Sequence, residues 1–303
     1  MNAETFTLTS PKEPRPRKRL GGWTWGPLES AKLRALSMGA GVQTTALALM
    51  ACRGIVGPRP DVVIMSDTGD ESSKTYHHWR WLKTEIARLS NGQVECIDVS
   101  RGERLSDRIR KRASGEAGYG KQERFVSAPF FTSNGGQGKR QCTREFKIEP
   151  LEKEQRRLMG FKPRQRIPAK SCEVWIGITT NEIVRAGAAF APWAVNRYPL
   201  LEQRMSRSDC ERWLIAEGYP VPPKSACVFC PYRSDREWRW LKENDPDAFE
   251  EACQIDELIR RSPGMKYQEY LHDSRRPLRE VDLSTAEERG QGMLMVCEAG
   301  CGL

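Results

Sequence analysis

The stretch Leu33-Arg-Ala-Leu-Ser-Met-Gly-Ala-Gly-Val-Gln-Thr-Thr45 decides the fold of this chain. Its first five residues form a short, mostly apolar run, which predicts a buried strand. A glycine-rich turn follows, and a helical pattern then runs from Thr44 to Ala51. Successive glycines let backbone N–H groups turn toward an anion, and the N-terminus of the next helix adds partial positive charge. We therefore expect residues 37–45, here called the anion loop, to bind an anion.

Five residues of the anion loop are candidate phosphate ligands. Ser37, Thr44 and Thr45 carry hydroxyls that can donate hydrogen bonds to phosphate oxygens, and Gly39 and Gly41 allow close approach of the backbone. The loop lacks the Gly-Lys-Ser/Thr end of a Walker A loop and the GxGxxG pattern of a Rossmann dinucleotide site. A plain tight turn remains an alternative interpretation of this segment.

Strand and helix patterns alternate after this stretch. Apolar runs at 62–65, 94–99 and 174–178 predict further strands, and helical patterns are expected at 72–89, 104–113, 143–159, 209–217 and 238–261, the last with a break near Pro246. Such alternation predicts an α/β fold with a doubly wound parallel sheet that helices cover on both faces.

Three regions are expected along the chain. Residues 1–30 are rich in Pro and Arg and predict a flexible basic tail. Residues 31–200 are expected to form the nucleotide-binding α/β domain, and 201–303 a helical, cysteine-bearing C-terminal region that completes the site. Six glycines within 114–141 predict a mobile loop there.

Composition limits the class of protein and of partner. Lys and Arg number 49 against 40 Asp and Glu, and the net charge of +9 favours anionic partners such as nucleotides or nucleic acid. No apolar run approaches the roughly 18 residues of a membrane helix, and no signal-peptide segment is evident. We therefore expect a cytoplasmic protein with no membrane partner. With ten cysteines and three histidines, any metal site should be rich in sulfur.

A second motif, Ser66-Asp-Thr-Gly-Asp-Glu71, follows the second predicted strand. Ligands of open α/β sheets bind at the carboxyl ends of strands. An acidic loop there can hold ribose hydroxyls, an amine or Mg²⁺, and the alternative is a turn that caps the next helix.

Together the two loops resemble the PP-loop adenine-nucleotide hydrolase-like superfamily, and within it the phosphoadenosine phosphosulfate reductase family. Further segments similar to that family's landmarks are Asp67-Thr-Gly-Asp-Glu71 with Thr75-Tyr76, Cys142-Thr-Arg-Glu-Phe-Lys-Ile-Glu-Pro-Leu151, Gly177-Ile-Thr-Thr-Asn-Glu-Ile-Val-Arg185, Tyr198-Pro-Leu200, Cys227-x-x-Cys230-Pro231 and Gly300-Cys-Gly-Leu303. The resemblance implies a Rossmann-like fold and an adenine nucleotide held by Asp67 and Glu71, directly or through Mg²⁺. It also implies substrate binding by Arg185.

The sequence departs from the family in two places. The family's loop is Ser-Gly-Gly-x-Asp-Ser, whereas this loop is two residues longer and has no Asp. The branch with an iron–sulfur cluster usually has a Cys-Cys pair before its basic stretch, whereas Gln141-Cys142 offers one sulfur.

Cys142, Cys227 and Cys230 are the candidate metal ligands. The C-x-x-C spacing suits one metal or one cluster, and Cys142 can fold back beside it. Three thiolates can hold a [4Fe–4S] cluster with one open iron, which the resemblance to cluster-dependent thiolation enzymes associates with a labile sulfide. A fourth ligand from Cys172, Cys210 or Cys253 would close the site around a cluster or zinc. A plain redox pair is the remaining alternative.

Cys301, near the end of the sequence, is the candidate nucleophile. By the family's chemistry its thiolate attacks the sulfur of a nucleotide sulfate, and a second thiol, from Cys297 or a thioredoxin-like donor, releases sulfite. Lys139, Arg140, Arg144, Lys147 and Arg185 are candidates to neutralise the anionic substrate. His272 is a possible acid or base, but a surface histidine is the expected interpretation.

Three functions follow from these observations. The first is an enzyme of the phosphoadenosine phosphosulfate reductase type, which converts a nucleotide sulfate to sulfite. The second is an ATP-dependent, iron–sulfur-dependent thiotransferase that modifies nucleic acid. The third is a zinc-stabilised nucleic-acid-binding module without turnover, for which salt-dependent binding is expected.

Overall fold

The computed structural model describes residues 19–115, 128–263, 265–285 and 288. A six-stranded sheet lies at its centre, and each strand is parallel to its neighbours. In spatial order the strands are β1 (Gly22–Thr24), β7 (Ala194–Arg197), β6 (Cys172–Ile176), β2 (Leu33–Met38), β3 (Val62–Asp67) and β4 (Glu95–Ser100). The predicted α/β class with a parallel sheet is confirmed, and the architecture is consistent with a Rossmann-like fold.

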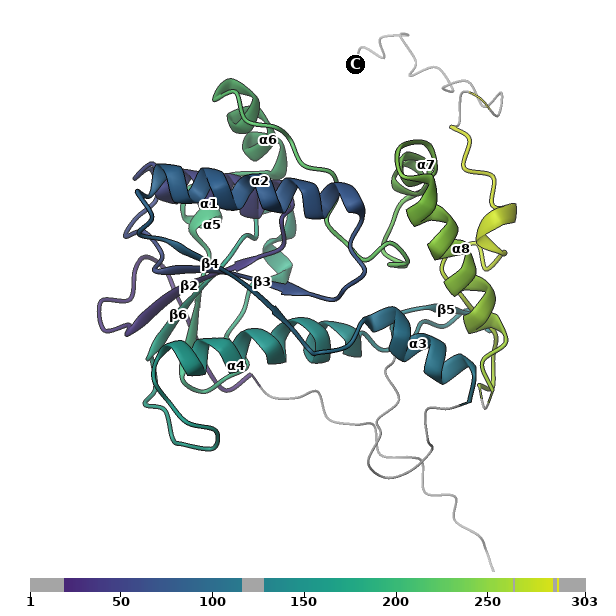
Figure 1. Cartoon of the computed structure of the whole chain (residues 1–303), viewed down its shortest axis with the longest axis horizontal. Coiled ribbons are helices and arrows are strands. Elements are labelled where there is room, and N and C mark those ends of the chain that lie inside the picture. Colours follow the sequence, from purple (N-terminus) through teal and green to yellow (C-terminus); the bar gives the residue numbers. More distant parts are fainter. Residues whose placement is uncertain (1–18, 116–127, 264, 286–287, 289–303) are drawn as a thin grey trace, which may run out of the picture.

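Helices cover both faces of the sheet (Figure 1). The α-helices are α1 (Val42–Cys52), α2 (Ser73–Leu89), α3 (Leu105–Ala113), α4 (Glu149–Leu158), α5 (Pro199–Glu202), α6 (Arg207–Ala216), α7 (Asp235–Asn244) and α8 (Pro246–Arg260). A π-helix, η1 (Thr143–Ile148), and two 3₁₀ helices, η2 (Thr180–Arg185) and η3 (Leu278–Glu280), complete the set. Helix α1 packs against α2 and α6 on one face, and α4 packs against β2, β3 and β4 on the other.

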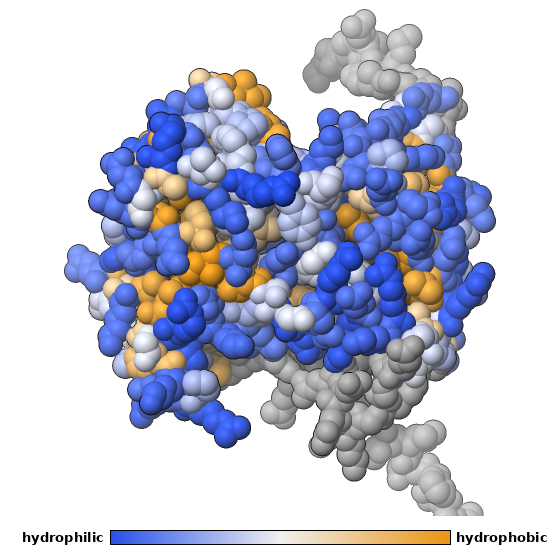
Figure 2. Space-filling view, viewed as in Figure 1, coloured by the Kyte–Doolittle hydropathy of each residue, from blue (hydrophilic) through white to orange (hydrophobic). Residues whose placement is uncertain are grey.

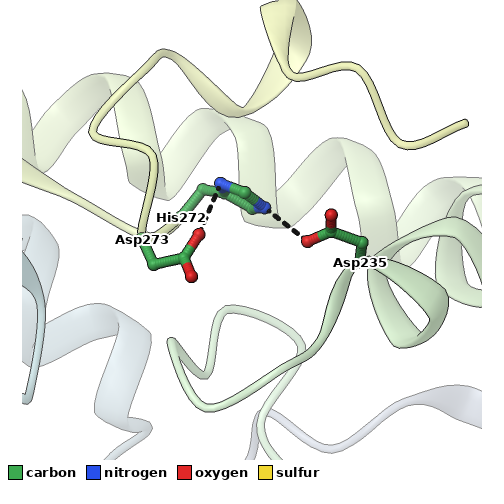
Figure 3. Close-up of side chains that lie close together, drawn as sticks. All are labelled: Asp235, His272 and Asp273. Carbon is green, nitrogen blue, oxygen red and sulfur yellow. Dashed lines mark hydrogen bonds and ion pairs between the residues drawn. The ribbon is translucent and has the colours of Figure 1, made fainter. Parts of the chain in front are cut away.

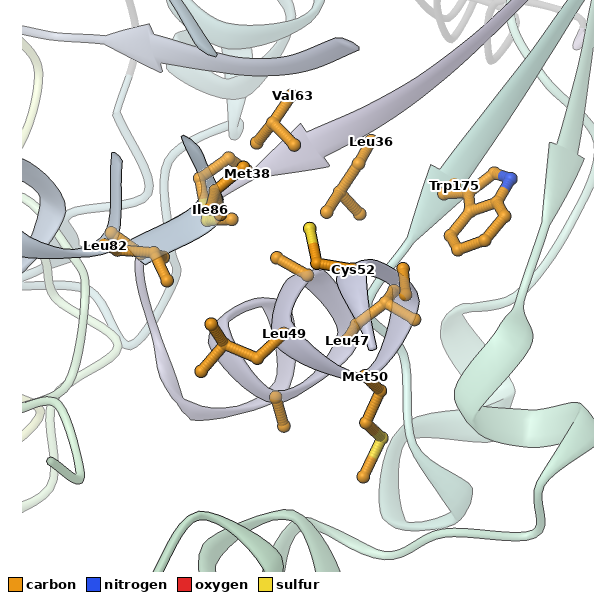
Figure 4. Close-up of a cluster of buried hydrophobic side chains, with 14 of the residues drawn as sticks. Leu36, Met38, Leu47, Leu49, Met50, Cys52, Val63, Leu82, Ile86 and Trp175 are labelled. Carbon is orange, nitrogen blue, oxygen red and sulfur yellow. The ribbon is translucent and has the colours of Figure 1, made fainter. Parts of the chain in front are cut away.

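The largest core lies between the sheet and α1. Helix α1 is apolar on nearly all sides because it packs on the sheet, on α2 and on α6 at once. Figure 4 shows Cys52 of this helix pointing toward Leu36 of β2 and Val63 of β3, whereas Met50 points away from the sheet. Helix α2 is amphipathic instead, and its N-terminus is capped by the Ser72 hydroxyl, which accepts from the Thr75 N–H.

A second core forms around α7 and α8. Its apolar side chains come from these helices, from α3 and from the segments 128–146 and 227–230, so it joins parts of the chain on both sides of residue 200. The short antiparallel pair β5 (Phe131–Thr132) and β8 (Glu269–Tyr270) belongs to the same side of the molecule. The space-filling view shows the surface hollowed between the α6 side and the α7 side (Figure 2).

The sheet also includes residues that the sequence placed in the tail. Gly22–Thr24 pair with Val195–Arg197 as an edge strand, and Gly21 is so close to the carbonyls of Ala191 and Ala194 that a Cβ would lie 2.4 Å from each. Strands this short have too few residues for a period-2 pattern, which explains why β1 and β7 were not predicted. Among the described residues, no helix is both long and apolar enough to cross a membrane.

Candidate functional site

The carboxyl ends of β2 and β6 lie side by side where the strand order changes direction. From β2 the sheet continues through β3 to β4, and from β6 it continues through β7 to β1. Open α/β sheets bind ligands in the crevice outside such a switch point. The anion loop follows β2 directly, so it lies where this fold class binds ligands.

The backbone of the anion loop adopts a conformation that is unusual for a residue with a side chain. Ala40, between Gly39 and Gly41, has φ of 55° and is completely buried. A Cβ in this left-handed region costs about 1–2 kcal/mol. Such strain is retained only where the surroundings enforce it, and it is frequent at ligand-binding segments.

Gly177, at the end of β6, allows helix α1 to begin close to the sheet. A Cβ at this position would lie 2.8 Å from Thr44 Cγ2 and 3.3 Å from the Thr44 backbone nitrogen. No side chain fits there without displacing the first turn of α1. The glycine therefore fixes the N-terminus of α1 over the switch point.

The three predicted hydroxyl donors of the loop face different surroundings. Ser37 is half-buried at the end of β2. The Thr44 hydroxyl donates to the Gly41 carbonyl at 3.3 Å, inside the loop. Thr45 is completely buried, and its hydroxyl lies 3.0 Å from His78 Nε2. Ser37 and Thr44 are thus placed at the loop, whereas the Thr45 hydroxyl is engaged with helix α2.

Arg185 lies at the rim of the same crevice. It ion-pairs with Glu182, and the second carboxylate oxygen of Glu182 accepts from Gln43 Nε2 at 3.1 Å. Gln43 belongs to the first turn of α1. The predicted substrate residue Arg185 is about half exposed and is linked through one carboxylate to the anion loop.

Asp67 shapes the acidic loop that follows β3. Its Oδ1 accepts from the Gly69 N–H and from the Tyr76 hydroxyl, both at 2.7 Å. Asp70 is buried and accepts from Arg104 and from the Ser106 N–H, which anchors the start of α3. Burial raises the pKa of Asp70, and these donors lower it in part. The carboxylates of Asp67 and Asp70 therefore hold the acidic loop in its conformation and join it to the start of α3.

Glu71 turns toward the C-x-x-C segment. It forms a backbone bridge with Cys227, and the Asp70 carbonyl accepts from the Val228 N–H at 2.7 Å. Its carboxylate lies 3.4 Å from Lys147 Nζ and accepts from the Ser225 hydroxyl, also at 3.4 Å. The structure thus places Glu71, predicted to hold the nucleotide or its metal, between two residues of the cysteine segments.

Cys142, Cys227 and Cys230 line one cavity of about 100 Å³, here called the cysteine cavity. The other side chains around it include Thr68, Arg140, Lys147, Ser225 and Tyr232. Cys142 immediately precedes the π-helix η1, whose Phe146 carbonyl accepts from the buried Ser66 hydroxyl at 2.8 Å. Single-turn π-helices are frequent at functional sites. Segments far apart in the sequence thus bring three thiols together.

Two of these thiols favour the protonated form. Burial raises the pKa of Cys227, against the opposing effect of Lys147, and the Thr68 hydroxyl lies 3.1 Å from its sulfur. Burial, and then the neighbouring Cys230, raise the pKa of Cys142. Binding of a metal or cluster by these thiolates would therefore release protons.

The candidates for a fourth cysteine ligand lie elsewhere. Cys210 belongs to the core of α1, Cys172 to the core of α4, and Cys253 lies in α8 outside the cavity lining. Burial raises the pKa of Cys253 to about 11 and that of Cys210 to about 12. Within the described part of the chain the cavity therefore offers three thiols.

The three thiols of the cysteine cavity are not gathered as closely as the ligands of a single zinc ion. Zinc–sulfur bonds of about 2.3 Å in a tetrahedron bring ligand sulfurs to about 3.8 Å from one another. Among the His, Cys, Asp and Glu side chains of the described residues, the only group of three or more whose ligand atoms all lie within 4.8 Å of one another is Asp235, His272 and Asp273. The sulfurs of Cys142, Cys227 and Cys230 are therefore spread more widely than this.

Cations lie at the cavity and at its exposed side. Burial lowers the pKa of Lys147, but Glu71 and the thiols of Cys227 and Cys230 outweigh this effect and raise it. Arg140 is exposed, and its guanidinium lies 5.1 Å from the Tyr232 ring centre. Arg144, also predicted to neutralise the substrate, instead ion-pairs with Glu152 and Glu149.

Ser225 joins the anion loop to the cysteine cavity. A Cβ on Gly41 would lie 3.6 Å from Ser225 Cβ, while Ser225 also lines the cavity two residues before Cys227. The predicted phosphate loop and the predicted thiol ligands are therefore neighbours. Thr68 and Asp70 belong to the acidic motif at 66–71 but were not predicted as site or anchoring residues, and Ser225, two residues before Cys227, was not predicted at all.

His272 is buried, which contradicts the expectation of a surface histidine. Figure 3 shows its ring between two carboxylates, with Nε2 3.0 Å from Asp235 and Nδ1 3.2 Å from Asp273. Nδ1 also lies 2.8 Å from the Ser274 hydroxyl. The group joins the start of α7 to the segment after β8, and one ligand atom from each of its three residues lies within 4.8 Å of the others, as a metal site would require.

The candidate nucleophile Cys301 and its neighbour Cys297 lie outside the described residues. No protein-family model and no curated protein matches this chain. Interpretation of the site therefore depends on the geometry above.

Proposed function

We propose that this protein is an enzyme that uses an adenine nucleotide to carry out sulfur chemistry at the cysteine cavity. The observation that carries the proposal is the position of three thiols in one cavity whose wall, at Ser225, contacts the anion loop. The parallel sheet and the loop at its switch point support membership of the PP-loop superfamily, as the sequence resemblance suggests.

The reaction that the described residues support best is ATP-dependent sulfur transfer to an acceptor such as a base in nucleic acid. The acceptor oxygen attacks the α-phosphate, so pyrophosphate leaves. Sulfide then attacks the activated carbon, and AMP leaves with the former acceptor oxygen, so no electrons are transferred. Residues of the anion loop would bind the phosphates, and Arg185 would contact the substrate at the rim of the crevice.

An iron–sulfur cluster on Cys142, Cys227 and Cys230 would supply the sulfide. Three thiolates leave one iron without a protein ligand, which suits the delivery of a sulfur atom. Lys147 lines the cavity and ion-pairs with Glu71, and the two side chains would orient the acceptor.

A second candidate is reduction of a nucleotide sulfate, favoured by Lys147 and Arg140 at the same cavity, because both can bind sulfate. In that reaction the Cys301 thiolate attacks the sulfate sulfur, and the nucleotide leaves as the sulfur–oxygen bond breaks. A second thiol, from Cys297 or a thioredoxin-like donor, attacks the Cys301 sulfur. A disulfide forms, and sulfite leaves with the electron pair.

The first experiment is purification without oxygen, followed by measurement of iron, labile sulfide and zinc. We expect iron and sulfide in equal amounts in the wild-type protein, and loss of both in Cys142→Ser, Cys227→Ser and Cys230→Ser. Cys253→Ser is the matched control, because this buried cysteine belongs to the same core but lies outside the cavity lining, and it should retain iron. One tightly bound zinc without iron would contradict cluster-dependent sulfur transfer and leave the Cys301 reaction or the nucleic-acid-binding module.

The second experiment separates the two reactions. The iron-loaded protein is given ATP with nucleic acid, or a nucleotide sulfate with a thiol donor. Release of AMP and pyrophosphate that requires nucleic acid supports sulfur transfer. Release of sulfite that is lost in Cys301→Ser supports reduction, and neither product from the loaded protein would contradict both.

A further inference from the structure

Arg233 is a buried cation behind the C-x-x-C segment. Arg233 is 8% exposed, and its Nη2 donates hydrogen bonds to the carbonyls of Ala226 at 3.0 Å and Cys227 at 3.2 Å. The guanidinium carbon lies 5.6 Å from the centre of the Trp238 ring, which is completely buried. Arg233 thus holds the backbone on which Cys227 is mounted.

The charge of Arg233 has no carboxylate partner in the described part of the chain. The two carboxylates that face it are committed elsewhere: Glu71 to Lys147 and Ser225, and Glu237 to Lys224 at 2.6 Å and the Ser234 N–H at 2.8 Å. Its Nε is buried, and no hydrogen-bond partner for it lies among the described residues.

The other arginines that are buried in the described part of the chain have carboxylate partners. Arg197 contacts Glu173 and Glu202, and Arg112 contacts Glu269. An isolated charge inside a protein is strongly unfavourable unless an opposite charge compensates it. Burial lowers the pKa of Arg233, and the groups that oppose this effect are, in order, Cys230, Glu71, Glu237 and Cys227. Because the Cys227 carbonyl accepts from Arg233 and Cys227 lines the cysteine cavity, a negative charge held in that cavity would lie near the guanidinium.

We propose that Arg233 is a positioning residue whose guanidinium compensates the negative charge of the thiolate-bound group at Cys142, Cys227 and Cys230. This inference rests on the proposed function, since the group is the cluster proposed there. The two carbonyl contacts fix the C-x-x-C backbone against the guanidinium. Hydrogen bonds and charges near a cluster set its stability and its reduction potential.

The proposal predicts opposite effects of one substitution on the empty and the loaded protein. Arg233→Gln keeps an N–H donor for a carbonyl but removes the charge. Without iron, its Tm should be equal to or higher than that of the wild type, because a buried uncompensated charge is gone. With iron, it should lose iron faster to a chelator, and the reduction potential of the remaining cluster should be more negative, because removal of a nearby positive charge disfavours the reduced state.

Two further variants complete the test. Arg236→Gln makes the same charge change at an exposed position three residues away and should change neither iron retention nor potential. Arg233→Lys keeps the charge and should retain a potential near that of the wild type, with weaker protection from the chelator.

The outcomes distinguish this inference from the proposed function. Absence of iron in the wild-type protein would contradict both. Iron in the wild type, with the same potential and the same iron loss in Arg233→Gln as in Arg236→Gln, would contradict the role of Arg233 alone. A fall in Tm of the iron-free Arg233→Gln protein as large as that of the loaded one would indicate a merely structural arginine and would also overturn the proposal.

Discussion

The anion loop and the cysteine cavity are neighbours, yet they are held in place in different ways. The loop lies on an apolar core and depends on close backbone contact, as at Gly177. Charged groups lie at or near the cavity, among them Lys147 with Glu71 and the buried Arg233. The buried ion pair of Arg112 and Glu269 belongs to the same half of the molecule, where Arg112 lies over the Phe130 ring of the second core. We therefore expect the stability around the anion loop to fall when a side chain gains volume or charge there. We expect the stability around the cysteine cavity to fall when a charged side chain is removed.

The largest effect is expected where a buried charge of the second core loses its partner. Arg112 and Glu269 are 3% and 2% exposed. Glu269→Gln should lower the free energy of unfolding by about 3–5 kcal/mol, because the carboxylate that compensates Arg112 is removed. Urea denaturation at pH 7 measures this change. Glu250→Gln, which breaks the exposed pair with Arg279, should have little effect, and equal losses in both variants would contradict the contrast.

A moderate effect is expected where volume is added at the anion loop. Gly177→Ala places a methyl group against Thr44, so it should lower the free energy of unfolding by about 1–3 kcal/mol and weaken nucleotide binding. Denaturation and titration calorimetry with ATP measure the two effects. Gly22→Ala is the matched control, because its Cβ would make an ordinary contact, 3.6 Å from Val195 Cγ2. Thr44→Ser should restore part of the loss, and unchanged ATP affinity in Gly177→Ala would contradict the assigned role.

The smallest effect is expected from protonation of the buried His78 of helix α2 at low pH. Burial lowers the pKa of His78 from 6.5 to about 4. Between these values the unfolded chain binds a proton that the folded chain does not, so stability falls as pH decreases from about 6.5 to about 4. The loss should be about 1 kcal/mol between pH 7.5 and 5.5.

His78→Gln should remove this part of the pH dependence, as measured by urea denaturation at several pH values. His77→Gln is its control, since His77 is exposed and adjacent. An identical pH dependence in wild type and His78→Gln would contradict the role of His78.

Local patterns predicted much of the sheet and the first half of the site. The apolar runs at 33–37 and 62–65 correspond to β2 and β3, and the glycine-rich turn lies between β2 and α1 as expected. The break at Pro246 separates α7 from α8. These features depend on neighbouring residues, so the sequence contains the information directly. The short strands β1 and β7 depend on pairing with each other across 173 positions of sequence, as between Gly22 and Val195, and have no such local pattern.

For the cysteine cavity, the sequence predicted only which cysteines would act together. The C-x-x-C spacing indicated that Cys227 and Cys230 act together, and the resemblance added Cys142. Nothing in the sequence indicated that Glu71 would contact Lys147 and Ser225, or that Arg233 would be buried without a carboxylate. Such contacts depend on how separate segments pack, and the same charged residues would be ordinary on an exposed surface.

The sequence by itself determined the parallel α/β class and the glycine-rich loop between its strand and helix. It also determined which residue types are able to bind a metal through sulfur. Each of these follows from periodicity or spacing within a few residues, where the geometry of the backbone sets the outcome. Only the tertiary structure decided that the loop and the thiols meet at Ser225, that the Thr45 hydroxyl faces His78, and that Arg233 is enclosed behind Cys227. Burial and neighbouring charge define these roles, and both exist only once distant segments have packed together.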